Sequence, residues 1–157
     1  HWPSRRGGAE ASAPARAAAA QVVRQAVDSL HALNRQAVVV VMGDFNDAPE
    51  DPAPKQVLGA GWPVEVGPVL VNPFLSFQGD STLGSYRYRG SWQFIDHISV
   101  SPAACNGQAK VQYVAGSAGA YLQPWMLEAS GKFAGNPLRT YGGKTYLGGF
   151  SDHPPVK

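Results

Sequence analysis

Apolar and polar positions follow three different patterns along the chain. Residues 12–33 repeat apolar side chains at spacings of three and four, which predicts a helix with Ser12 as N-cap and Pro14 in its first turn. Residues 37–42 form a continuous apolar run, as expected of a central strand covered on both faces. Residues 86–100 contain alternating stretches around a turn, which predicts a hairpin. The apolar stripe expected on the helix consists of Val22, Val23, Ala26, Val27, Leu30 and Leu33.

The rest of the chain predicts shorter elements. Residues 55–58 follow a Pro-rich and acidic loop and predict a short helix, and residues 110–114 alternate as a short strand would. Residues 116–149 are rich in Gly and aromatic side chains without a sustained period, which predicts a long surface loop. With no linker in the sequence, we expect an α/β fold in which residues 1–157 form one domain.

Composition narrows the function only a little. The net charge is +2 with scattered charges, so no basic stripe indicates a nucleic-acid partner. Cys105 is the one cysteine and has no partner in the chain for a disulfide. No apolar run approaches the roughly 18 residues of a membrane span, so we expect a soluble chain without a transmembrane segment. The compartment stays open, and secreted and periplasmic locations of a bacterial-type protein are both allowed.

The segment Gly43-Asp44-Phe45-Asn46-Asp47 ends the central apolar run. In an extended backbone Asp44 and Asn46 would face one side while Phe45 turns toward the core. An ionised Asp there can orient or deprotonate water, and an Asn amide can donate to a phosphate oxygen. The simpler alternative is that Asp and Asn only form the turn after a strand.

A second candidate pair, Asp152-His153, lies near the end of the sequence. Asp96 from another element could accept a hydrogen bond from His153 and fix its tautomer, which leaves Asp152 free for a hard cation such as Mg²⁺. The alternative is a solvated polar pair. His97 alternates away from Asp96, so we expect it to support the site indirectly or to lie at the surface.

The predicted hairpin contains four aromatic residues, Tyr86, Tyr88, Trp92 and Phe94, for which two interpretations are open. They could stack on a base or sugar, or they could fill the sheet interface, and packing is the favoured alternative. Arg5, Arg6, Arg87, Arg89 and Arg139 are candidate phosphate contacts without an assigned role.

Taken as a set, the GDFN, DHI and SDH motifs at residues 43–46, 96–98 and 151–153, with the opening His1-Trp2, resemble the endonuclease/exonuclease/phosphatase superfamily. That superfamily includes deoxyribonuclease I, abasic-site endonucleases, sphingomyelinases and inositol-polyphosphate phosphatases. The resemblance implies the C-terminal half of a four-layered α/β sandwich, with a mixed β-sheet, flanking helices and the N-terminal half absent.

The resemblance also implies residue roles. His1 would contact the scissile phosphate, and Asp44 and Asn46 would position water and transition state. Asp96 would orient His153, which would act as general base or as a phosphate-stabilising acid. The implied cofactor is Mg²⁺ or Mn²⁺, held in part by Asp152. The implied substrate is a phosphoester in a nucleic acid, a phospholipid or a sugar phosphate.

Family members carry an additional Asn and a metal-binding Glu on the other half of the sandwich, which we expect to be a missing partner of this chain. The leading hypothesis is therefore a Mg²⁺-dependent phosphoester hydrolase that is inactive as this fragment alone. The alternatives are a non-catalytic or degenerate relative that acts as a binding module, and an independent α/β domain with a metal site at Asp44, Asp152 and His153.

Overall fold

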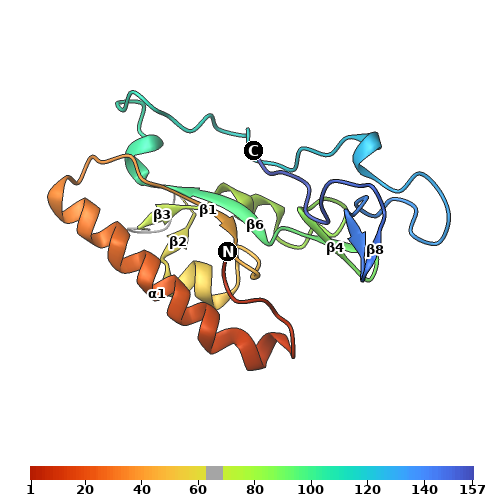
Figure 1. Ribbon diagram of the computed structural model, residues 1–157. Coiled ribbons are helices and arrows are strands. Elements are labelled where there is room, and N and C mark those ends of the chain that lie inside the picture. The colour runs from red at the N-terminus through yellow and green to blue at the C-terminus, as the bar shows by residue number, and fades with distance from the viewer. Residues whose placement is uncertain (63–68) are drawn as a thin grey trace.

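A mixed four-stranded sheet with the long helix α1 across one face organises the chain (Figure 1). The computed structural model describes residues 1–62 and 69–157. The strands follow the order β1-β6-β3-β2, and β6 runs antiparallel to both β1 and β3, whereas β2 and β3 are parallel. Their bounds are β1 Val40–Asp44, β2 Ala60–Gly61, β3 Leu70–Val71 and β6 Asp96–Val100. The predicted mixed α/β class is confirmed.

Helix α1 spans Ala9–Leu33 and begins one turn earlier than predicted. The N-cap position belongs to Gly8, so the assignment of Ser12 as N-cap is wrong: its hydroxyl donates within the helix to the Gly8 carbonyl, 2.7 Å away. The predicted apolar stripe is also partly wrong, because Leu33 is 87% exposed. The buried face instead follows Arg16, Ala20 and Val27, a spacing that the alanine-rich sequence conceals.

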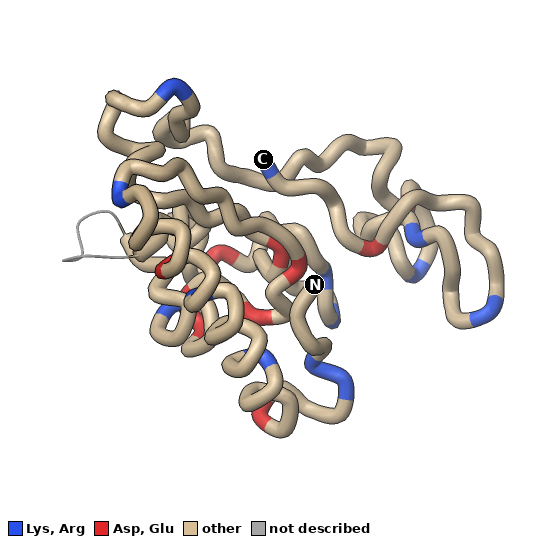
Figure 2. The backbone as a smooth tube through the Cα atoms, turned by 60° about the vertical axis from the view of Figure 1, so that its left-hand side comes forward, with Lys and Arg blue, Asp and Glu red and all other residues tan. Residues whose placement is uncertain are grey.

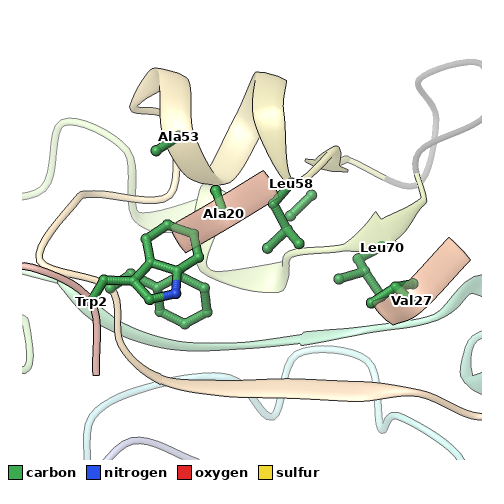
Figure 3. Packing of buried hydrophobic residues seen from close by; sticks show 8 residues of the cluster. Trp2, Ala20, Val27, Ala53, Leu58 and Leu70 are labelled. Carbon is green, nitrogen blue, oxygen red and sulfur yellow. The ribbon is translucent and has the colours of Figure 1, made fainter. Parts of the chain in front are cut away.

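The main hydrophobic core lies between α1 and the sheet (Figure 3). Trp2, Phe45, Leu58 and Leu70 contribute the large side chains, and Ala20 lets the helix approach closely. The π-helix η1 (Ala53–Val57) packs beside α1 and confirms a short helix in this region. Burying one such Leu side chain contributes about 1.5–3 kcal/mol, so this core anchors the segment that follows β1.

Strand β1 has one covered and one exposed face, which corrects the expectation of burial on both sides. Val39 and Val41 pack on the core beneath α1. Val40 and Met42 point the other way and are 48% and 72% exposed. The strand also extends beyond the predicted end to include Gly43 and Asp44, which places the Asp44 carboxylate on the sheet rather than in a loop.

A second sheet is the predicted hairpin, formed by β4 (Tyr86–Tyr88) and β5 (Ser91–Gln93). Arg89 and Gly90 make its turn with φ angles of 49° and 90°, the pair of positive values that a tight hairpin turn of matching twist requires. The hairpin closes before β6, which joins the main sheet instead. The described residues also contain three 3₁₀ turns, namely η2 (Pro73–Phe77), η3 (Pro102–Ala104) and η4 (Pro124–Met126).

The C-terminal third differs from the expectation in two places. Residues 110–114 form no strand, so that prediction is wrong. The segment 116–149, expected to be a loop throughout, contains a small hairpin of β7 (Tyr141–Gly142) and β8 (Thr145–Tyr146). Figure 2 shows Lys and Arg positions at several separate places along the described backbone. No helix of the described residues has the length and apolar character needed to cross a bilayer.

Candidate active site

The register of β1 and β6 brings two carboxylates together. Asp44 lies directly opposite Asp96 in the antiparallel ladder, so both side chains leave the same face of the sheet with Cβ atoms about 5 Å apart. This face is the one opposite α1. Like charges at such positions repel each other, so a positive charge nearby would stabilise the pair.

His153, near the end of the sequence, carries such a positive charge beside Asp96 when it is protonated. Its Nδ1 lies 2.7 Å from Asp96 Oδ2, which makes Nδ1–H the donor and leaves Nε2 for another partner. The hydrogen bond to Asp96 raises the pKa of His153 against the effect of burial, and the charges of Asp96, Asp44 and Asp152 raise it further. Residues 151–153 form no strand, so His153 reaches the sheet from an irregular segment.

Asp44 is the second acidic group of the site. Burial raises its pKa, the backbone N–H of Asn46 opposes that rise, the charge of Asp96 adds to it and the charge of His153 lowers it again. His1 Nε2 lies 3.2 Å from Asp44 Oδ2, with the His1 side chain 68% exposed. The structure therefore places His1 and His153 on the two carboxylates that face each other.

Asn46 reaches the same place through a turn rather than through strand alternation. Its φ of 50° is left-handed, a conformation that Asn tolerates better than most residues. Its backbone N–H donates to Asp44 Oδ1 at 2.7 Å, and its amide Nδ2 donates to the Trp2 carbonyl at 3.1 Å. Nδ2 also lies 3.5 Å from His1 Nε2, so the second amide hydrogen is directed toward the site.

A buried network behind Asn46 holds this turn, and the sequence did not reveal it. Arg16, only 2% exposed, places Nε 2.7 Å from Asp47 Oδ1. Arg5 Nε donates to the Asn46 carbonyl at 2.6 Å, and Arg5 Nη2 pairs with Asp51 at 3.0 Å. Two arginines thus fix both sides of the turn, although an arginine among the alanines of a helix gives no local signal of such a role.

His97 belongs to the same support and is fully buried, so the surface alternative is wrong. Its ring stacks on Phe45 with centroids 3.9 Å apart. Asn72 Oδ1 accepts from Phe74 N–H, which identifies its Nδ2 as the donor to His97 Nδ1 at 3.1 Å. His97 Nε2 then donates to the Asp47 carbonyl at 3.3 Å. Burial lowers the pKa of His97 to about 4.

Ser85 is a further positioning residue that the sequence did not indicate. Its buried hydroxyl accepts hydrogen bonds from the backbone N–H groups of Ile95 and Asp96, at 3.2 and 2.9 Å. These bonds hold the entry to β6 just where Asp96 leaves the sheet. A serine beside a glycine reads as an ordinary turn residue, so only the tertiary structure shows this contact.

The predicted residues border one cleft of about 800 Å³. Its lining includes His1, Asp44, Asn46, Asp152 and His153, while Asp96 lies behind His153 through their hydrogen bond. Tyr86 and Tyr88 form another part of the wall. Trp92 and Phe94 are buried, so the aromatic residues of the hairpin divide between cleft and core.

The donor set suits a hard divalent cation. Asp44, Asp96 and His153 each offer a ligand atom, and these atoms lie within 4.8 Å of one another. Carboxylate oxygens are the ligands preferred by Mg²⁺ and Mn²⁺, and one or two of them suffice when waters complete the shell. Asp152 lines the cleft but stands outside this cluster, so its role as a metal ligand remains a prediction.

Comparison with known families agrees with these features. The endonuclease/exonuclease/phosphatase family model matches residues 1–157, and the chain belongs to this family. Members are typically metal-dependent phosphoester hydrolases. Among curated proteins and solved structures, none matches the chain significantly.

Proposed function

We propose that the cleft hydrolyses a phosphoester by attack of water on phosphorus, with a divalent cation as cofactor. The observation that carries this proposal is the Asp96–His153 hydrogen bond of 2.7 Å beside the carboxylate of Asp44. A carboxylate that holds one imidazole nitrogen makes the other nitrogen a better base, which is what activation of water requires.

Each cleft residue then has a distinct role. His153 takes or gives a proton at Nε2 while Asp96 keeps its ring in place. Asn46 donates an amide hydrogen to a phosphate oxygen as negative charge develops there, and His1 binds the phosphate from the opposite side. Buried Arg16 and half-buried Arg5 keep Asn46 in position behind the turn, since its left-handed backbone needs support from outside the turn.

Mg²⁺ or Mn²⁺ would be held by Asp44 together with Asp152. When bound, such an ion stabilises the negative charge that accumulates on the phosphoryl oxygens. Burial is the main cause of the raised pKa of Asp44, and the charge of Asp96 adds to it. A bound cation would offset both effects by stabilising the ionised carboxylate.

We further propose that the sheet is half of a larger α/β sandwich. Val40 and Met42 leave an apolar strip exposed on the face opposite α1. Ile98 lies opposite Met42 in the register and packs against the small buried cluster of Val71, Val100 and Ala104. An apolar sheet face normally needs a covering layer. A complementary N-terminal half would supply that layer and raise the activity of the cleft above that of this chain alone.

The test is hydrolysis of bis-p-nitrophenyl phosphate, p-nitrophenyl phosphate and plasmid DNA with Mg²⁺, Mn²⁺ or EDTA. The assay compares this chain with the same chain fused to a complementary half. Asp44→Asn and His153→Gln should each lower metal-dependent hydrolysis at least about 100-fold. Asp28→Asn, a change on the exposed side of α1, is the matched control. Equal activity in all three variants would refute the assignment, and phosphate binding without any hydrolysis would favour a binding module.

A further inference from the structure

A row of flat groups leads out of the cleft from His153. The ring of Tyr86 lies 4.8 Å from that of His153, centroid to centroid. Tyr88 follows at 6.5 Å from Tyr86, with the two planes only 15° from parallel. The Arg89 guanidinium then lies 5.2 Å from the Tyr88 ring. Both tyrosines line the cleft, so this row connects the candidate catalytic histidine with the outside of the hairpin.

The spacing of the two tyrosine rings follows from β4. Residues two apart on a strand share a face, about 6.7 Å from each other. That separation is close to twice the 3.4 Å interval between stacked nucleobases, about 6.8 Å. A flat ring can therefore stack against either tyrosine without a change in the strand. Tyr88 is half exposed, unlike the buried Trp92 of the next strand, so its ring has a free surface for such a ligand.

Positive charges accompany these rings. Arg6 lines the cleft, and Arg89 lies over Tyr88. Within residues 1–62 and 69–157, neither side chain has a carboxylate partner. A chain of phosphates would be attracted to these two arginines. A sugar phosphate has the charge but lacks a flat aromatic ring for Tyr86 and Tyr88.

From these observations we infer that Tyr86 and Tyr88 form a stacking subsite for nucleobases of a single-stranded nucleic acid, next to the scissile phosphate. The inference rests on the proposed phosphoester hydrolysis for the position of that phosphate. Flat bases joined by phosphates match the alternation of rings and cations along this wall. Stacking requires no base-specific hydrogen bonds, so the subsite accepts many sequences.

The test measures binding by fluorescence anisotropy. The probes are labelled hexathymidylate and an abasic deoxyribose-phosphate hexamer of equal charge, each with the complete 157-residue chain. Tyr88→Ala should weaken binding of hexathymidylate about 10-fold and leave the abasic hexamer unchanged, whereas Tyr88→Phe should retain binding. Tyr146→Ala, an exposed tyrosine of β8 that is absent from the cleft lining, is the matched control.

Three results would overturn the subsite: no binding of hexathymidylate, equal weakening of both hexamers by Tyr88→Ala, or Tyr88-dependent binding to phosphatidylglycerol vesicles in place of the oligonucleotide. Hydrolysis of bis-p-nitrophenyl phosphate separates this failure from failure of the proposed reaction. If His153→Gln abolishes hydrolysis of bis-p-nitrophenyl phosphate but the chain does not distinguish hexathymidylate from the abasic hexamer, the reaction is supported and the subsite is overturned. Selective binding of bases without hydrolysis supports the subsite and overturns the reaction.

Discussion

Acidification should destabilise the fold through His97. In the folded chain Asn72 donates to Nδ1 of this ring, so the neutral ring with its proton on Nε2 satisfies every contact. If Nδ1 of His97 were protonated, its N–H would face the amide N–H of Asn72, and two donors would lie opposite each other in the core. The pKa of His97 is lowered from 6.5 to about 4 by burial, and the unfolded chain therefore binds this proton more tightly than the folded chain does.

The size of the effect follows from linkage. Because the pKa is lower in the folded state, the free energy of unfolding falls as the pH drops below 6.5 and levels off below about 4. Between pH 7 and pH 5, the loss from this one group is about 2 kcal/mol. That is a substantial part of the 5–15 kcal/mol typical of a folded domain.

Urea unfolding followed by tryptophan fluorescence at pH 7 and pH 5 measures this loss. His97→Gln keeps a polar side chain but does not titrate, so the wild-type chain should lose about 2 kcal/mol more than the variant between the two pH values. The same loss in both proteins would refute the assignment. If the variant does not fold, an NMR titration of the wild-type ring decides instead, and a pKa near 6.5 would contradict the buried neutral state.

Three further predictions concern the ion pairs and the core. Asp96→Asn should lower the pKa of His153 toward its ordinary value, as NMR titration of the ring would show. In the wild-type chain that pKa is raised, so the ion pair stabilises the fold fully below about pH 6.5 and less as the pH rises through the folded pKa. If His153 had the same pKa in the Asp96→Asn variant as in the wild-type chain, the hydrogen bond would be contradicted. Arg16→Met should lower the free energy of unfolding by at most about 3–5 kcal/mol, because buried Asp47 loses its partner at 2.7 Å and keeps only the more distant Arg5, at 3.6 Å. A loss below 1 kcal/mol in urea would show that water reaches this carboxylate. Leu58→Ala should cost about 2–5 kcal/mol in the same assay through the cavity that it leaves, and a smaller loss would mean that the core collapses around it.

Local patterns predicted the elements whose causes are local. The helix, the central strand and the β4–β5 hairpin follow from periodicity and from the conformational freedom of Gly90, which a few neighbouring residues determine. The pairing of Asp96 with His153 was predicted from chemistry, because an imidazole base needs a carboxylate partner. The local patterns also located the turn after β1 that contains Asn46.

Other features depend on residues far away in the sequence. The network of Arg16 and Asp47 joins a helix to a loop, and no spacing within either segment indicates it. The exposed side of β1 was missed because a continuous apolar run does not show whether a second layer is present. The predicted strand at 110–114 failed for a related reason: alternation describes a strand only when another strand pairs with it.

The position of Asp44 opposite Asp96 also disfavours a shifted register of β1 and β6. A shift of either strand by one residue would turn its carboxylate toward the packed interior beneath α1. An unpaired carboxylate there would cost several kcal/mol. A misaligned molecule would therefore be less stable than the native one. In this way Asp44 and Asp96 favour the native alignment of the two strands.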